Sequence, residues 1–273
     1  EKIVDQIRAI TKKLALACGI RGLLNIQYAV RDEHVFVIEL NPRASRTVPI
    51  SSKATGVSLA KYASRIMAGE KISELRAQGL LPDENRTVDY YAVKEAVMPW
   101  SRFPGADSIL GPEMKSTGEV MGIARTFPAA YAKTREAVEN KLPEQGSVFI
   151  SVCDRDKRAI APVAMALENL GYGIYTTGGT AKTLRAAGID CTTVNRISDG
   201  HPNVVDLMRD KTVSFIINTP HGHEAHSDGT KMRAEAVSQG ITCVTAMSAA
   251  TALIQALAAA RKSEPETFAL QDL

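Results

Sequence analysis

The sequence predicts an α/β protein of two domains, and we expect the second domain to be a doubly wound parallel sheet. From residue 147 onward, short apolar strands alternate with helical segments, as is typical of a parallel sheet covered by helices on both faces. The length of 273 residues suits one large or two ordinary domains. Residues 140–146 (N-K-L-P-E-Q-G) are polar and contain a proline and a glycine. We therefore predict domains at residues 1–140 and 147–273, joined by this segment.

Composition excludes several classes of protein. Hydrophobic residues make up 45% of the chain and charged residues 23%, as in a globular protein that buries a core. A net charge of +3 and 5% aromatic residues favour neither a nucleic acid nor a membrane surface as partner. The four cysteines are widely spaced and form no C-x-x-C pair, which favours thiols in a reducing compartment over a disulfide frame or a zinc site. We expect a cytoplasmic protein.

The first 140 residues predict a helix, a β-hairpin and further α and β segments. Residues 1–18 have a helical period, and so do residues 58–69, with Ser58 as N-cap and Gly69 as the stop. Residues 23–30 and 35–40 are rich in β-branched and apolar side chains, and the R-D-E-H sequence near their junction predicts a hairpin. Residues 47–56 show little periodicity, so we expect a loop over an active site. A polar loop at 79–87, a strand at 90–99, a surface loop from 103 and a helix at 128–139 follow.

A single acid, Glu39, interrupts the apolar strand at residues 35–40. A charge in such a strand is costly unless something pairs with it. Asn41 projects from the same side of the strand, and Arg43 and Arg46 follow soon after Pro42. Two oxygen ligands beside two guanidinium groups suit Mg²⁺ with nucleotide phosphates. For Glu39 alone, a salt-bridged strand acid is an equal alternative.

Gln27, on the preceding strand, joins this group in only one hairpin register. If Arg31 pairs with Val35 across a three-residue loop, Gln27 lies opposite Glu39 on one face. A two-residue loop, with Arg31 facing His34, would put Gln27 and Glu39 on opposite faces. The metal interpretation therefore predicts the three-residue loop.

The longer run N-P-R-A-S-R-T-V-P-I-S-S-K-A-T-G-V resembles the ATP-grasp fold, and specifically the carbamoyl phosphate synthetase large-subunit family. The resemblance implies that the first domain is the C-terminal part of an ATP-grasp α+β domain. It implies metal roles for Gln27, Glu39 and Asn41, and catalytic contacts with phosphoryl oxygens for Arg43 and Arg46. The implied cations are Mg²⁺ or Mn²⁺ with ATP, and K⁺ is a further candidate. The run L-G-P-E-M-K-S-T-G-E-V-M-G resembles a second stretch of the same synthetase domain. With no glycine-rich phosphate loop before residue 100, we expect most of the ATP site upstream, in a longer polypeptide.

Five strands and five helices are expected to alternate in the second domain. The strands are predicted at residues 148–152, 174–176, 192–194, 213–218 and 243–245. The helices are predicted near residues 158–170, 181–187, 204–209, 230–239 and 248–260. Because ligands of such sheets bind at the carboxyl ends of the strands, the residues that follow each strand are the candidates for a site.

Three of these strand ends carry polar side chains. After residues 174–176, the run T-T-G-G-T leads into a helix whose free N–H groups and dipole attract an anion, and Thr177 and Thr180 add hydroxyl groups. The first strand is followed by C-D-R-D-K-R, which supplies Lys157, and Asn218 ends a later strand. A plain turn with a helix cap is the alternative for T-T-G-G-T on its own.

Together with V-N-R-I-S-D-G-H-P and I-I-N-T-P, these segments resemble the methylglyoxal-synthase-like domain, the allosteric module of the same large subunit. The resemblance implies that a nucleotide monophosphate such as UMP or IMP binds there as an effector. The implied effector-binding residues are Lys157, Thr177, Gly178, Gly179, Thr180, Arg196 and Asn218, the last as a base or ribose contact. Arg196 stands where the family often has Lys, and Pro220 stands where some members have Thr, so the identity of the effector stays open.

Three histidines, His221, His223 and His226, lie close together with Glu224 beside them. They lack the i, i+4 register of helical metal pairs, and the resembled family has no metal here. We expect a solvated loop or an effector contact.

The resemblance implies the half of the enzyme that phosphorylates carbamate with Mg-ATP and feeds arginine and pyrimidine biosynthesis. The implied partners are the remainder of the large subunit and a small glutaminase subunit, in a hetero-oligomer. The chain alone is expected to be inactive. The competing hypothesis is that the isolated chain is only a nucleotide-effector-binding module. A free-standing methylglyoxal synthase is a third interpretation, which leaves the first 140 residues unexplained.

Overall fold

A computed structural model describes residues 1–82, 88–103, 108–111, 113–138, 143–220, 228–262 and 266–272. The chain forms two compact units, Glu1–Asp89 with Thr267–Leu273, and Tyr90–Glu266. These units are a different division of the chain from the domain boundary at residues 140–146, which stays a prediction.

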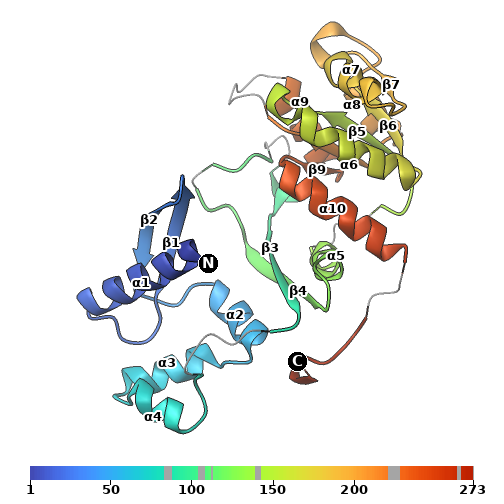
Figure 1. The fold of residues 1–273 in the computed structure, drawn as a ribbon. Helices are drawn as coiled ribbons and strands as arrows, with labels where there is room; N and C mark the ends of the chain where they lie inside the picture. The colour runs from blue at the N-terminus through green and yellow to red at the C-terminus, as the bar shows by residue number, and fades with distance from the viewer. Residues whose placement is uncertain are drawn as a thin grey trace. The chain divides into compact units, whose positions relative to one another are not determined.

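The first unit contains one hairpin and four α-helices among its described residues (Figure 1). Its elements are α1 (Lys2–Ala17), β1 (Asn25–Arg31), β2 (His34–Asn41), α2 (Thr47–Thr55), α3 (Leu59–Met67), α4 (Ile72–Ala77) and the short 3₁₀ turn η4 (Leu270–Asp272). Helix α3 begins after Ser58 and ends before Gly69, which has a φ of +109°, as the sequence predicts. Few side chains in this unit are fully buried, and α1 has none.

The prediction of a loop at residues 47–56 is wrong, because this segment forms helix α2. Pro49 fits in the first turn, where a backbone N–H has no helical partner to lose. Gly56 closes the helix with a left-handed conformation, at a φ of +70°. The helical period was weak in the sequence because this nine-residue helix has no fully buried face.

The prediction of a three-residue hairpin loop is also wrong, although Gln27 does pair with Glu39. Arg31 pairs with His34 across a two-residue turn, in which Asp32 and Glu33 have φ values of +49° and +63°. Positive φ at both central residues suits the twist of a tight hairpin. A bulge between Gln27 and Tyr28 then shifts the register by one residue. Gln27 consequently pairs with Glu39, as the metal interpretation requires.

The second unit is built on a five-stranded parallel sheet, in the order β7-β6-β5-β8-β9. This confirms the predicted doubly wound sheet. The strands are β5 (Ser147–Ser151), β6 (Gly173–Thr176), β7 (Thr192–Thr193), β8 (Phe215–Asn218) and β9 (Thr242–Val244). The helices are α6 (Lys157–Asn169), α7 (Gly178–Ala186), α8 (Val204–Arg209), α9 (Asp228–Ser238) and α10 (Met247–Ala260), with 3₁₀ turns η2 (Asp154–Asp156) and η3 (Ile197–Asp199).

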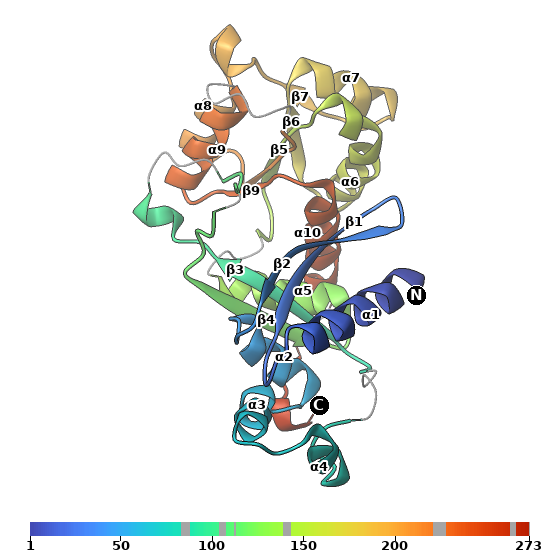
Figure 2. The same cartoon turned by 90° about the vertical axis from the view of Figure 1, so that its left-hand side faces the viewer.

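Alternate side chains of β5 enter two separate cores, one on each face of the sheet. Val148 and Ile150 belong to the core made with α6, α7 and α10, whereas Phe149 belongs to the core made with α8 and α9. Figure 2 shows α8 and α9 on the opposite side of the sheet from α6 and α7. This double cover leaves the carboxyl ends of the strands accessible at the edge of the sheet.

The same unit also contains an antiparallel pair of strands. The pair is β3 (Tyr91–Val97) and β4 (Gly118–Ala124), joined through a segment that contains the 3₁₀ turn η1 (Trp100–Arg102) and followed by α5 (Phe127–Ala137). Helix α5 contacts both β4 and α10, and Tyr131 of α5 packs against the core on the α10 face. The strand predicted at 90–99 and the helix predicted at 128–139 are therefore confirmed to within a few residues.

Residues 143–146, which precede β5, are fastened to the amino-terminal edge of the parallel sheet. Four consecutive backbone carbonyls each accept a hydrogen bond from a different donor. The pairs are Tyr172 Oη to Pro143 O, Arg261 Nη2 to Glu144 O (2.7 Å), Ser214 Oγ to Gln145 O (3.1 Å) and Gly173 N to Gly146 O (3.1 Å). Arg261 also lies over the Tyr172 ring, 5.1 Å from its centroid. This end of the predicted linker is thus held in one conformation.

Candidate functional site

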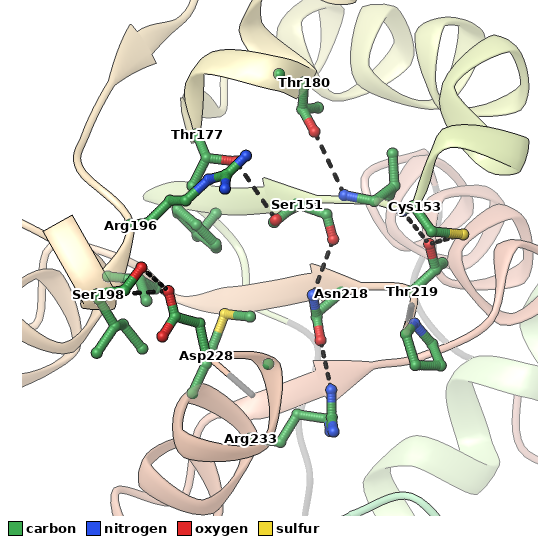
Figure 3. A pocket seen from close by; sticks show the side chains of 18 of the residues that line it. Ser151, Cys153, Thr177, Thr180, Arg196, Ser198, Asn218, Thr219, Asp228 and Arg233 are labelled. Atoms are coloured by element: carbon green, nitrogen blue, oxygen red, sulfur yellow. Dashed lines mark hydrogen bonds between the residues drawn. The ribbon is translucent and has the colours of Figure 1, made fainter. Parts of the chain in front are cut away.

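A cavity of about 500 Å³ opens at the carboxyl ends of β5, β6 and β8 (Figure 3). It lies where the strand order changes direction, because β6 flanks β5 on one side and β8 flanks it on the other. Such a switch point is where open parallel sheets bind ligands. Six of the seven residues that the sequence assigns to the effector line it: Lys157, Thr177, Gly179, Thr180, Arg196 and Asn218. The seventh, Gly178, is the first residue of α7.

One corner of the cavity is suited to an anion. Thr177 is the N-cap of α7, and its hydroxyl makes no capping bond, lying 3.5 Å from Ser151 Oγ. A Cβ placed on Gly179 would stand 3.6 Å from Lys157 Nζ, so the ammonium group lies beside the start of the helix. Lys157 forms an ion pair with Asp154, whose side chain is 80% exposed. Free N–H groups, a helix dipole and an ammonium group together attract phosphate.

Two of the predicted effector residues are engaged in the protein's own structure. Thr180 is buried, and its Oγ1 accepts a hydrogen bond of 3.4 Å from the Val152 backbone N–H. Asn218 is also buried, and its Nδ2 donates to Ser151 O at 2.9 Å. Its Oδ1 accepts a hydrogen bond of 2.8 Å from Arg233 Nη1. Asn218 therefore ties β8 to β5 as well as facing the cavity.

Arg196 stands at the start of η3, on the loop that follows β7. Its side chain is exposed, and within the described residues it makes no hydrogen bond or ion pair. Figure 3 shows it extending toward Thr177. An unengaged guanidinium group beside the anion corner is placed to bind a second face of a phosphate.

A carboxylate lies on another wall of the cavity. Asp228, the first residue of α9, accepts two hydrogen bonds on Oδ2, from Ser198 N at 3.0 Å and from Ser198 Oγ at 2.9 Å. Figure 3 shows these two residues side by side, apart from Thr177 and Thr180. The bonds fasten η3, and with it the loop that carries Arg196, to α9.

Cys153, Asp156 and Thr219 form a small hydrogen-bonded group next to the cavity. Cys153 Sγ donates to Asp156 Oδ2 at 3.1 Å, and Thr219 Oγ1 accepts from the Cys153 backbone N–H at 3.1 Å. The hydrogen bond from Cys153, with a second contribution from Thr219, holds the pKa of Asp156 below its usual value. These bonds join the loop after β5 to the loop after β8.

Sequence reasoning missed Ser151, Ser198, Asp228 and Arg233 as cavity residues. Ser151 ends the first strand, so the rule about strand ends could have found it. Asp228 and Arg233 lie on a helix that enters the cavity from a different part of the chain, and no motif in the sequence includes them. The histidines at 221, 223 and 226 and Glu224 lie outside the described residues.

The second set of predicted residues lies on the hairpin of the first unit. Gln27 and Glu39 are paired across β1 and β2, and Asn41 Nδ2 donates to Glu39 Oε1 at 2.8 Å. Gln27 and Glu39 are exposed, and Asn41 is half-buried. Within the described residues, no three His, Cys, Asp or Glu side chains gather in a metal-binding group. A metal held here would therefore use amide oxygens together with one carboxylate.

Arg43 and Arg46 follow directly after β2, and both side chains are exposed. Arg43 donates through Nη1 to the neighbouring Ala44 O at 3.1 Å. Arg46 is the N-cap residue of α2. The two arginines thus lie in the short connection between the strand that carries Glu39 and the next helix.

Comparison with known families divides the chain in the same way as its motifs. Residues 1–75 match the family described as carbamoyl-phosphate synthase L chain, ATP binding domain. Residues 159–245 match the family described as MGS-like domain. The hairpin residues fall in the first match, and most of the residues around the cavity fall in the second.

Relatives match almost the whole chain. It is 46% identical over 271 residues to the carbamoyl phosphate synthase large chain of Acidobacterium capsulatum, which covers 99% of this chain and 25% of that protein. It is 42% identical over 280 residues to the carbamoyl phosphate synthase large chain, C-terminal section, of Aquifex aeolicus, covering 97% of this chain and 52% of that protein. The section of the same name from Methanocaldococcus jannaschii is 46% identical over 279 residues, covering 100% of this chain and 45% of that protein.

These matches first define a class of protein, in which the end of an ATP-binding domain is followed by an MGS-like domain. The chain belongs to the carbamoyl phosphate synthase large-chain family and corresponds to its C-terminal section. It spans about a quarter of the length of the full large chain that it matches. The first 140 residues, which a free-standing methylglyoxal synthase would leave unexplained, are covered by these relatives. None of the helices in the described part of the chain has the length and apolar character to cross a membrane.

Proposed function

We propose that the chain is part of a glutamine-hydrolysing carbamoyl phosphate synthase and contributes to the ATP-dependent phosphorylation of carbamate. The observation that carries this proposal is the pairing of Gln27 with Glu39, with Asn41 bonded to the same carboxylate. Arg43 and Arg46 follow at once in the chain. The product would feed arginine and pyrimidine biosynthesis, and the partners would be the rest of the large chain and a small glutaminase subunit.

The hairpin residues fit a hard cation. Glu39 Oε2 makes no hydrogen bond to the described residues, and the side-chain oxygens of Gln27 and Asn41 also accept none there. Mg²⁺ and Mn²⁺ prefer such carboxylate and amide oxygens and take their remaining ligands from phosphate and water. A bound divalent cation would neutralise charge on the nucleotide phosphates.

The chain's own contribution to the reaction is positioning and charge. Phosphoryl transfer needs little covalent help, so the protein must hold the transferred group in line and balance its charge. Arg43 and Arg46 would donate to phosphoryl oxygens, with the geometry fixed by the end of β2 and the start of α2. Asn41 orients the Glu39 carboxylate through its 2.8 Å bond.

Replacement of one carboxylate oxygen tests this proposal. In the complete large chain that carries this section, Glu39→Gln should reduce carbamoyl phosphate formation from carbamate and ATP by at least about a hundredfold, since the proposed hairpin site of Gln27, Glu39 and Asn41 loses its charged cation ligand. Glu33→Gln is the matched control, because Glu33 is an exposed turn residue of the same hairpin that pairs with Lys2. Full activity in Glu39→Gln would remove the metal assignment.

A second function is supported by the cavity in the parallel-sheet region. The described residues that line it lie between Phe149 and Arg233, within one unit of this chain, whereas the first match covers the end of an ATP-binding domain. The anion corner formed by α7, Lys157 and Arg196 supports a nucleotide monophosphate such as UMP or IMP as the effector. As an isolated chain, the protein would then bind effector without catalysing the reaction.

A further inference from the structure

The proposed cation site on the hairpin depends on an irregularity in the pairing of its strands. Tyr28 pairs with Val37, and Gln27 pairs with Glu39. Ile38 is thus an extra residue of β2, with no partner on β1. If the pairing from the turn continued without this bulge, Gln27 would face Ile38, and Glu39 would lie on the opposite face of the hairpin. The bulge therefore decides whether the amide and the carboxylate share a face.

Tyr28, the residue next to the bulge, is tied to helix α1 by its hydroxyl group. Its Oη lies 2.7 Å from Oγ1 of Thr11, and both residues are half-buried. Thr11 Oγ1 donates to the Ile7 backbone carbonyl at 2.7 Å. Since a hydroxyl group has one proton to donate, Tyr28 must donate to Thr11. The two bonds form a chain that runs from β1 into the backbone of α1, and each bond in such a chain polarises the other.

Burial constrains the hairpin only weakly. None of the residues of α1, β1 or β2 is fully buried, and Ile38 is 62% exposed. A two-stranded ribbon with open faces has a weakly specified register. Successive side chains of a strand point to opposite faces, so a Tyr28 side chain held toward α1 turns Gln27 to the other face. The bulge then lets Glu39 reach the face of Gln27 while Val37 stays opposite Tyr28.

We propose that Tyr28 and Thr11 are positioning residues for this cation site. Their hydrogen bond fixes the face that β1 turns to α1, and the bulge brings Glu39 opposite Gln27. Neither side chain would touch the cation, because Tyr28 points to the face opposite Gln27. Their role rests on the metal role proposed above for Gln27, Glu39 and Asn41, and it adds the residues that hold this set in register.

Mn²⁺ binding to the complete large chain that carries this section tests the role of the hydroxyl pair. Electron paramagnetic resonance measures free Mn²⁺ in the presence of a non-hydrolysable ATP analogue. Tyr28→Phe and Thr11→Val each remove a hydroxyl group and keep the bulk of the side chain. Each should weaken Mn²⁺ affinity by about threefold to tenfold, as expected for one lost hydrogen bond. The double variant should bind no more weakly than the single ones, since both substitutions remove the same bond.

Three further variants serve as controls. Thr11→Ser keeps the hydroxyl group and should bind Mn²⁺ as the wild type does. Tyr62→Phe removes from α3 a hydroxyl group that makes no hydrogen bond within the described part of the chain, and it should also have no effect. In the Glu39→Gln background, Tyr28→Phe should change Mn²⁺ affinity by less than about twofold, because the carboxylate that the tyrosine positions is gone.

The outcomes separate the positioning role from the metal role on which it rests. If Glu39→Gln binds Mn²⁺ as tightly as the wild type, the metal role of the hairpin is wrong. If Glu39→Gln weakens binding but Tyr28→Phe and Thr11→Val do not, the metal role stands and the hydroxyl pair does not position the site. If Tyr28→Phe lowers the melting temperature and weakens Mn²⁺ binding by the same factor with and without Glu39→Gln, the bond only supports the fold and the positioning role is wrong.

Discussion

The hairpin of the first unit and the parallel sheet of the second hold their functional side chains in different ways. Phe36 and Ile38 of β2 are 52% and 62% exposed, whereas Phe149 and Phe215 of the parallel sheet are 1% and 0% exposed. On the hairpin, Gln27 and Glu39 are aligned by backbone register. In the parallel sheet, the cavity rests on strands that are packed on both faces. The pairing register of the two strands positions the hairpin residues, whereas a packed core positions the residues around the cavity.

The largest expected effect comes from opening a cavity in the packed region. Phe215→Ala should lower the free energy of unfolding by about 3–5 kcal/mol, because the ring is fully buried and stacks edge-on against Tyr172. Phe36→Ala on the exposed hairpin should change it by only about 0.5 kcal/mol. Urea unfolding followed by circular dichroism measures both. Equal losses in the two variants would show that the hairpin depends on packing as much as the sheet does.

A smaller effect is expected where residues 143–146 are fastened to the sheet. Gly146 has a φ of +122°, and a Cβ there would lie 2.1 Å from Ser214 Oγ. Gly146→Ala should therefore cost about 1–3 kcal/mol of unfolding free energy. Gly171→Ala is the matched control, because Gly171 also has a positive φ, +78°, but no atom lies within 4 Å of its added Cβ. The loss of unfolding free energy should be larger for Gly146→Ala than for Gly171→Ala, because only the first adds a clash with Ser214 Oγ. Adding Ser214→Gly to the Gly146→Ala variant should restore part of the lost unfolding free energy. No recovery would mean that backbone strain alone sets the cost.

The smallest expected effect is electrostatic and occurs in both regions. The hydrogen bond from Arg65 lowers the pKa of Glu70 in the first unit, and the hydrogen bond from His201 lowers the pKa of Asp206 in the second. A folded-state pKa below the unfolded value gives stability that is present above the unfolded pKa and is lost as pH falls through the folded pKa. Melting temperature should thus fall with acidification below about pH 4.

The variants Glu70→Gln and Asp206→Asn should each flatten that fall slightly, and their melting curves should converge with the wild-type curve at the acid end. A wild-type acid slope that neither substitution alters would assign the loss to other carboxylates.

The sequence predicted the strands and helices of the parallel sheet to within a few residues, because each strand is a short apolar run followed by a turn and a helix. It also placed Thr177, Gly179 and Thr180 beside the cavity, since T-T-G-G-T lies at a strand end. It could not predict the bulge at Gln27, because one extra residue in a strand leaves no signature in an apolar run. Helix α2 was missed because a helix without a fully buried face has little apolar period. Arg233 was missed because its contact with Asn218 joins residues from two elements that only the fold brings together.

The most direct test of this account is a calorimetric titration of the chain with UMP and then IMP, repeated with Thr177→Ala. Thr177 stands at the start of α7, and its hydroxyl is free of a capping bond. We expect saturable binding in the wild type and affinity at least about tenfold weaker in the variant, because a phosphate contact is lost. The control Thr183→Ala, farther along the same helix, should bind as the wild type does. Wild-type affinity in Thr177→Ala would contradict the assignment of the anion corner, and silence toward both nucleotides in the wild type would contradict the effector function.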